Sequence, residues 1–255
     1  MKSTIIYTVL SLFFLVGCTS KIVFEPTVPV VIIPNSELII SEISTAINTD
    51  PAPFRNHYLE LYNGGNTAID LSNYAIGYFA TKDTFTLADF DFSLVGSFIS
   101  FNKMLDTGKC YVIASPQCDL TKVKADTTWG TSSSTVVNSS NPLQLSGNSA
   151  IALLKKNATG THNLGSNTYK IVDVFGSPMV ARFKFQGTQS SRNNIMWAIA
   201  GETKDTRNRT FFRKVTVKKP TTDWDVSRGT DANNSQWILS GDKAWDYTNV
   251  GLPTQ

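Results

Sequence analysis

Apolar and polar residues alternate along much of the chain with a period of two, in short runs bounded by Gly, Asn, Asp and Pro. This period is typical of β-strands with one buried face, whereas amphipathic helices repeat every 3.6 residues. We expect no amphipathic helix longer than one or two turns. The clearest strand candidates are residues 38–43, 58–62, 74–79, 110–114, 151–154, 171–175, 211–217 and 237–239.

Turn signals separate these runs. One example is Asn63-Gly64-Gly65-Asn66, where glycine and asparagine tolerate positive φ. About seven to nine short strands with such punctuation favour an all-β sandwich over an open sheet. Two polar stretches, residues 127–141 and 157–168, are expected to be long loops within one domain, since surface insertions cost little closure entropy.

The N-terminal residues have a different pattern, with Lys2 followed by an apolar run that ends at Leu15-Val16-Gly17-Cys18. The run has about 12 residues, whereas a membrane-spanning helix needs roughly 20. The four residues resemble the lipobox of bacterial lipoproteins. The resemblance implies that residues 1–17 are a cleaved signal peptide and that Cys18 is acylated. An ordinary secretory signal with a chance cysteine is the alternative.

Residues 18–36 contain Pro26, Pro29 and Pro34 among β-branched residues, a composition that favours extended backbone. We interpret them as a tether between the acylated cysteine and a domain at residues 37–255. In the alternative interpretation, apolar residues 28–33 add an edge strand to that domain.

The formal net charge is +3, and the basic residues are scattered except in residues 207–219. Nucleic acid is therefore not expected as a partner. Most charges of residues 207–219 alternate or pair around apolar residues, which favours a solvated strand face over a contact with anionic lipid or another polyanion.

Catalytic and metal-binding motifs are missing from the sequence. His57 and His162 lie far apart without zinc-binding spacing, and there is no Gly-x-Ser-x-Gly elbow or glycine-rich phosphate loop. We therefore predict a protein that is not an enzyme, with no catalytic residue, no metal and no cofactor. A Ser/His/Asp triad that meets only in space stays open.

Two kinds of side chain remain as candidates for special roles. Cys110 and Cys118 face an oxidising compartment after export, so a disulfide is reasonable. An extended strand at residues 110–114 would, however, separate the two beyond bonding distance unless the chain turns at Ser115-Pro116.

Trp129 lies in a Gly/Ser/Thr-rich loop, where a tryptophan can stack on a sugar ring, although core packing is the commoner role.

Several strand candidates carry motifs that resemble the lamin-tail domain in its bacterial versions. The matching residues are Leu38-Ile39-Ile40-Ser41-Glu42-Ile43, Tyr58-Leu59-Glu60-Leu61-Tyr62-Asn63, Ile69-Asp70-Leu71-Ser72-Asn73-Tyr74, Tyr111-Val112-Ile113-Ala114, Ala150-Ile151-Ala152-Leu153, Ile171-Val172-Asp173-Val174-Phe175-Gly176 and Arg209-Thr210-Phe211-Phe212-Arg213-Lys214. The resemblance implies an immunoglobulin-like β-sandwich. This chain exceeds the usual length of the domain.

The motif residues can be explained by structural roles, without a catalytic or ligand-binding function. In residues 58–62, alternation places Leu59 and Leu61 on the core face and Glu60 on the other. Glu60 is expected to accept hydrogen bonds from backbone or from an arginine such as Arg55. Asn63 is expected to begin a turn, and Asp70 to form an Asx-turn. We expect structural roles for all three.

The sequence thus predicts a lipid-anchored, non-catalytic binding or scaffolding module of the cell envelope, with an unknown protein or glycan partner. A glycan-binding accessory lipoprotein that uses loop aromatics is the alternative. Thr19 after Cys18 does not resemble an inner-membrane retention signal, so the outer membrane is expected. Lys21, in a tether without an acidic cluster, slightly favours the periplasmic face over the cell surface.

Overall fold

The computed structural model describes residues 38–48, 54–80, 95–130, 143, 145, 147, 149–178, 182–185 and 195–252. The chain divides into two units, residues 1–33 and 34–255, and all described residues belong to the second. The predicted signal peptide, Cys18 and the tether lie outside the described residues. Within the described segments, no helix has the length and apolar character needed to cross a membrane.

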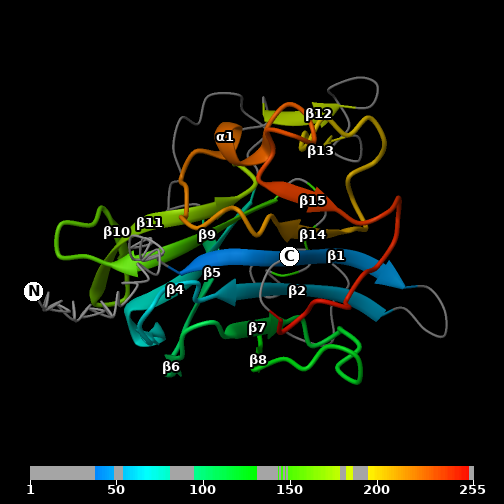
Figure 1. Cartoon of the computed structure of the whole chain (residues 1–255). Coiled ribbons are helices and arrows are strands. Elements are labelled where there is room, and N and C mark those ends of the chain that lie inside the picture. The colour runs from blue at the N-terminus through cyan, green and yellow to red at the C-terminus, as the bar shows by residue number, and fades with distance from the viewer. Residues whose placement is uncertain are drawn as a thin grey trace, which may run out of the picture. The chain divides into compact units, whose positions relative to one another are not determined.

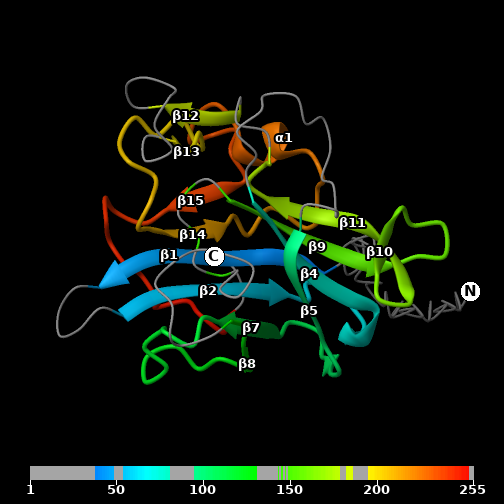
Figure 2. The same cartoon turned by 180° about the vertical axis from the view of Figure 1, so that it is seen from behind.

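The regular secondary structure of the described residues is almost entirely β-strand (Figures 1 and 2). The strands are β1 (Ile39–Asn48), β2 (Phe54–Tyr62), β3 (Ile69–Asp70), β4 (Tyr74–Ala80), β5 (Val95–Ser100), β6 (Met104–Leu105), β7 (Cys110–Ala114), β8 (Thr127–Thr128), β9 (Ser149–Lys156), β10 (His162–Leu164), β11 (Asn167–Phe175), β12 (Phe183–Phe185), β13 (Ile195–Trp197), β14 (Thr210–Arg213) and β15 (Trp237–Leu239). The helices are a 3-10 turn, η1 (Leu71–Asn73), and α1 (Trp224–Arg228).

Two sheets form the immunoglobulin-like sandwich. A six-stranded sheet has the order β15-β14-β1-β2-β7-β8, and a five-stranded sheet has the order β10-β11-β9-β4-β5. Every pairing in them is antiparallel except β7 with β8. The all-β sandwich expected from the sequence is confirmed.

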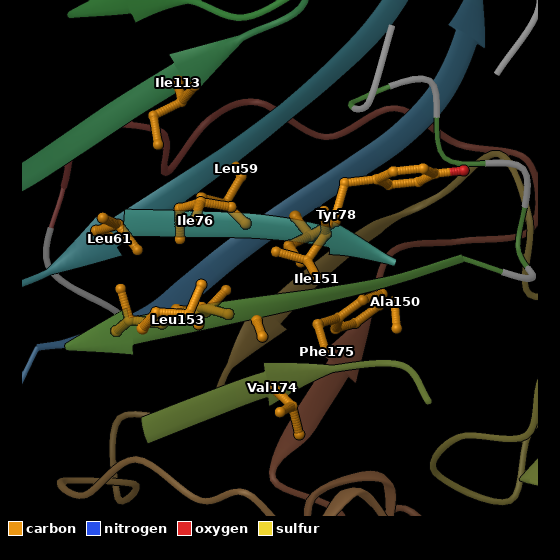
Figure 3. Packing of buried hydrophobic residues seen from close by; sticks show 14 of the residues in the cluster. Leu59, Leu61, Ile76, Tyr78, Ile113, Ala150, Ile151, Leu153, Val174 and Phe175 are labelled. Atoms are coloured by element: carbon orange, nitrogen blue, oxygen red, sulfur yellow. The ribbon is translucent and has the colours of Figure 1, made fainter. Parts of the chain in front are cut away.

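The core lies between the inner faces of these sheets. Figure 3 shows side chains from both, with Leu59 and Ile113 near Ile76 and Ile151, and all four are fully buried. Removing such a side chain from water contributes about 1.5–3 kcal/mol to folding. This apolar burial is the main force that holds the sheets together.

Strand β1 contains a β-bulge, which explains the spacing of the core residues at the start of its motif. Its register with β2 shifts between Ile40 and Glu42, so Ser41 is an extra residue in β1. Because a β-bulge changes which face the following residues occupy, Ile40 and Ile43 both point into the core although they are three apart. Simple alternation does not anticipate this.

Each of the eight strand candidates coincides with a strand, but the prediction for residues 211–217 was too long. Strand β14 ends at Arg213, and the solvated strand face expected across residues 207–219 is wrong. Arg209 and Arg213 are 2% and 0% exposed. The guanidinium of Arg209 binds Glu202 at 2.9 Å and Asp242 at 3.2 Å, which offsets the loss of hydration.

Arg213 is the centre of a buried connection between the two sheets. Its guanidinium nitrogens lie 3.3–3.4 Å from the carboxylate of Asp173 on β11, and both side chains are fully buried. The Asp173 carboxylate also accepts hydrogen bonds from the backbone N–H groups of Ile40, at 2.9 Å, and Thr221, at 3.0 Å. Strand β11 of one sheet is thereby tied to β14 and β1 of the other.

Two residues further along β11, Phe175 is surrounded by aromatic rings. Its centroid lies 5.0–5.2 Å from those of Trp197, Phe211, Trp224 and Trp237, all in edge-on geometry. Such aromatic pairs contribute about 0.5–1.5 kcal/mol beyond their buried area. Phe175 thus joins β13, β14, α1 and β15 to the core.

Breaking the buried pair should be far more damaging than breaking an exposed one. In Arg213→Met, Asp173 keeps its backbone donors but loses its counter-charge, so the free energy of unfolding should fall by about 3–5 kcal/mol. Arg182→Met is the matched control, because Arg182 pairs with Asp225 on the surface, where a loss of about 0–1 kcal/mol is expected. Urea denaturation measures both values, and equal losses would contradict the proposed importance of the buried pair.

Candidate functional site

The residues that the sequence singled out lie on several elements. Glu60 lies on the outer face of β2, beside Cys110 at the start of β7. Asn63 and Asp70 lie in turns that follow β2, Trp129 follows β8, and Cys118 follows β7. No described group of three His, Cys, Asp or Glu side chains is arranged to hold a metal ion. The chemistry of each place is therefore considered by itself.

Asn63 and Asp70 organise turns, as expected. The Asn63 side-chain amide donates to the carbonyl oxygens of Thr67 and Leu105, both at 2.9 Å, and its oxygen accepts from Gly65 N–H at 3.0 Å. Asp70 accepts from Ser72 N–H at 2.9 Å and caps η1. Hydrogen bonding to the Ser72 side chain, and then to its N–H, lowers the pKa of the exposed Asp70 carboxylate. Asp70 is thus an Asx-turn former on the surface.

Glu60 is buried and accepts hydrogen bonds, as expected, although it lies on the outer face of β2. Ser41 Oγ donates to its Oε1, and Gly251 N–H donates to its Oε2, each at 2.6 Å. Of the two kinds of donor expected, a backbone N–H is confirmed, whereas Arg55 lies opposite Ile47 towards the other end of β2. The true partners are a bulge residue and the C-terminal segment, which we define as residues 244–252.

A second acidic side chain lies directly opposite Glu60. Glu42 is its register partner across β1 and β2, and the hydroxyl of Tyr58 donates to Glu42 Oε1. Burial, reinforced by the charge of Glu60, raises the pKa of Glu42 to about 9. Burial also raises the pKa of Glu60 to about 7, against the hydrogen bonds from Ser41 and Gly251.

The C-terminal segment covers this acidic pair and belongs to a small second apolar cluster. Tyr58, Val112, Ala114, Cys118 and Val123 form its buried part, against which Ala125, Trp245, Tyr247 and Val250 pack. Figure 1 shows the segment in red, running over the β1, β2 and β7 side of the six-stranded sheet. No local pattern in the sequence predicts this cover, because its contacts join residues almost 200 positions apart.

His57, on the same strand as Glu60, is also held within the fold. Nδ1 of His57 lies 2.9 Å from the carbonyl oxygen of Leu143, and burial lowers its pKa to about 4. His57 is therefore neutral at pH 7. His162 lies on β10, in the other sheet of the sandwich.

Cys110 and Cys118 are free thiols, so the disulfide is not formed. Cys110 begins β7 and Cys118 follows its other end, and the extended strand keeps them apart. Cys110 Sγ instead donates to Leu252 O at 3.2 Å, whereas Cys118 Sγ lies 3.9 Å from Asn56 Oδ1. Burial raises the pKa of Cys118 to about 12 and that of Cys110 above its usual range, so both are protonated at neutral pH.

Trp129 is not an exposed loop aromatic. Trp129 is 8% exposed and its side chain belongs to the main core, while its backbone N–H donates to Ala114 O at 2.9 Å. The short parallel pairing of β8 with β7 directs the chain inwards just before Trp129. Of the two roles considered for Trp129, core packing is the one observed, and the ring is not available to stack on a sugar.

The burial of Trp129 predicts a large effect on stability. Trp129→Ala should lower the free energy of unfolding by about 3–5 kcal/mol, through lost apolar burial and the cavity left behind. Phe98→Ala is the control, since Phe98 is 43% exposed and should cost less than about 1 kcal/mol. A Trp129→Ala protein with an unchanged urea midpoint would show that the ring does not pack in the core.

Comparison with known proteins fits this geometry. The family model for the Lamin Tail Domain matches residues 33–244. A crystal structure of a DUF4876 family protein from Bacteroides thetaiotaomicron is similar, with 10% sequence identity, 86% of this chain and 72% of that chain covered, and a TM-score of 0.43. Comparison with curated proteins gives no match. Since the matched residues include both sheets of the sandwich, the chain belongs to the Lamin Tail Domain family.

Proposed function

We propose that this protein is a lipoprotein of the outer membrane, held there by acyl chains on Cys18, and that its Lamin Tail Domain is a non-catalytic binding or scaffolding module. The observation that carries the proposal is Leu15-Val16-Gly17-Cys18 at the end of a short apolar run. Two or three acyl chains hold a protein on a bilayer for long times, whereas a single chain binds only marginally. The domain then needs no membrane-binding surface of its own.

The environment of the charged side chains supports a non-catalytic role. Asp173, Glu42 and Glu60 are each at most 2% exposed and are engaged in contacts within the domain. A general acid or base needs access to its substrate. The most perturbed carboxyl groups of the described residues instead serve the packing of the sandwich.

A binding surface is best sought on the loops that the sandwich holds in place, because strands provide a rigid frame and loops vary. Among exposed apolar residues, Leu120 lies in the loop after β7 and Val226 lies on α1, with 46% and 56% of their surface accessible. We propose a protein partner rather than a glycan, since the burial of Trp129 removes the observation that favoured sugar stacking. Nucleic acid is not part of the proposal.

The membrane and its face are proposed from the residues after the acylation site. Thr19 supports sorting to the outer membrane, and Lys21 in a tether without an acidic cluster favours the periplasmic face. Protease treatment of intact cells tests this orientation. A periplasmic protein should survive the treatment, and its loss would place it on the cell surface.

Replacing the acylated cysteine tests the anchor. Cys18→Ser should abolish partition into the detergent phase and release the protein from membranes at high salt, because only the acyl chains provide membrane affinity. Cys110→Ser is the matched control, since this thiol lies in the folded domain and its loss should leave partition unchanged. A Cys18→Ser protein that stayed membrane-bound at high salt would contradict the lipoprotein assignment.

Crosslinking in cells tests the binding role. A photoreactive amino acid at Leu120 or Val226 should give a discrete adduct with a partner protein, whereas one at Ile238 on edge strand β15 serves as a comparison site. Mass spectrometry identifies the adduct. Adducts that are absent from all three sites, together with sugar-dependent quenching of tryptophan fluorescence, would favour the glycan-binding alternative over the scaffold.

A further inference from the structure

The acidic pair beneath the C-terminal segment is an unusual arrangement for a structural element. Glu42 and Glu60 face each other in register, and their side chains are 2% and 1% exposed. Two carboxyl groups in this position cannot both be ionised without strong repulsion in a poorly hydrated environment. Their protonation is therefore coupled to whatever covers them.

The cover consists of the C-terminal segment and depends on a few polar contacts. Gly251 N–H binds Glu60 at 2.6 Å, and Leu252 O accepts from Cys110 Sγ at 3.2 Å. The Tyr58 hydroxyl lies 3.3 Å from Asp246 O and also bonds Glu42. Each end of the segment thus contacts the acidic pair or a residue that contacts it.

The other charged groups around the pair are mainly acidic or neutral. Ser41 and Tyr58 face it from β1 and β2, Cys110 from β7, Asp126 from the loop before β8, and Asp246 from the C-terminal segment. Within the described residues, neither glutamate has a salt bridge to lysine or arginine. The nearby lysines are engaged elsewhere, Lys103 with Asp126 at 2.7 Å and Lys122 over the rings of Trp245 and Tyr247.

We propose that the C-terminal segment is a pH-controlled latch, which is closed over the sheet while Glu42 and Glu60 carry protons and opens when both are ionised. Opening would hydrate the two carboxylates and relieve their repulsion. It would also uncover Tyr58, Glu60 and Cys110 on the sheet face. The core between the two sheets does not contact this face and stays intact.

The direction of the pH effect follows from proton binding. The pKa values of about 9 for Glu42 and about 7 for Glu60 in the closed state lie above the ordinary value of 4.5. The closed state therefore binds more protons than the open state, and closure is lost as the pH rises through these values. Between pH 7 and 9 the difference is about one proton, so opening should increase roughly tenfold per pH unit.

Hydrogen exchange of the full chain, followed by mass spectrometry from pH 6.5 to 9, measures this opening. After correction for the intrinsic exchange rate, protection of residues 244–252 should fall roughly tenfold per pH unit, while protection of β14 stays constant. The double variant Glu42→Gln/Glu60→Gln should keep its protection across this range. Asp106→Asn is the matched control, because it removes an exposed carboxylate from the turn before β7 and should behave like the unmodified chain.

Constant protection of the segment in the unmodified chain, or an equal loss in the double variant, would overturn the proposal. If the double variant fails to fold, carbon-13 NMR titration of the glutamate carboxyl groups provides a test without substitution. Two carboxyl groups that titrate well above 4.5 in parallel with exchange of the segment support the latch. Ordinary titration of all glutamates near 4.5 would overturn it.

Discussion

The architecture depends on one buried ion pair that connects the two sheets. Asp173 belongs to the five-stranded sheet and Arg213 to the six-stranded sheet, and neither charge is accessible to water. Burial works to raise the pKa of Asp173, against Arg213 and the backbone donors of Thr221 and Ile40. Because arginine stays protonated, a buried guanidinium requires an anionic partner. Each sheet therefore supplies the counter-charge that compensates for burial of the charged side chain of the other sheet.

The same region of β11 also organises the aromatic core, which explains why its motif has an aspartate and a phenylalanine two residues apart. Asp173 fixes the strand against β1 and β14, and Phe175 then packs against four aromatic rings. Arg213 adds a contact over the Trp237 ring at 4.8 Å. An error in the pairing of these strands would leave a buried charge unpaired and the ring cluster incomplete.

Much of the fold was predictable because its long strands carry a clear period of two. The short strands were not, since two or three residues, as in β3, β6 and β8, cannot display a period. Helix α1 was also missed, although Asp223 caps it by accepting from Val226 N–H at 3.1 Å. One helical turn leaves too little pattern to separate it from a polar turn.

The site residues were harder to place than the strands, because burial of a charge depends on partners that are distant in sequence. Arg213 pairs with a residue 40 positions away, and Glu60 with one 191 positions away. Local alternation therefore places Arg213 on a solvated strand face and Glu60 on the face away from the core, and indicates the distant partner of neither. Trp129 is the opposite case. Its polar neighbours in the sequence are typical of an exposed loop, whereas the pairing of β8 with β7 directs its ring into the core.

The two buried charge systems contribute to the protein in opposite ways. Asp173 and Arg213 neutralise each other, so their contact persists at any pH at which the carboxyl group is ionised. Glu42 and Glu60 have the same sign, and their burial is favourable only while protons are bound. An apolar pair in their place would hold the C-terminal segment at every pH. The acidic pair thus gives a rigid sandwich one face whose cover can respond to its surroundings without loss of the core.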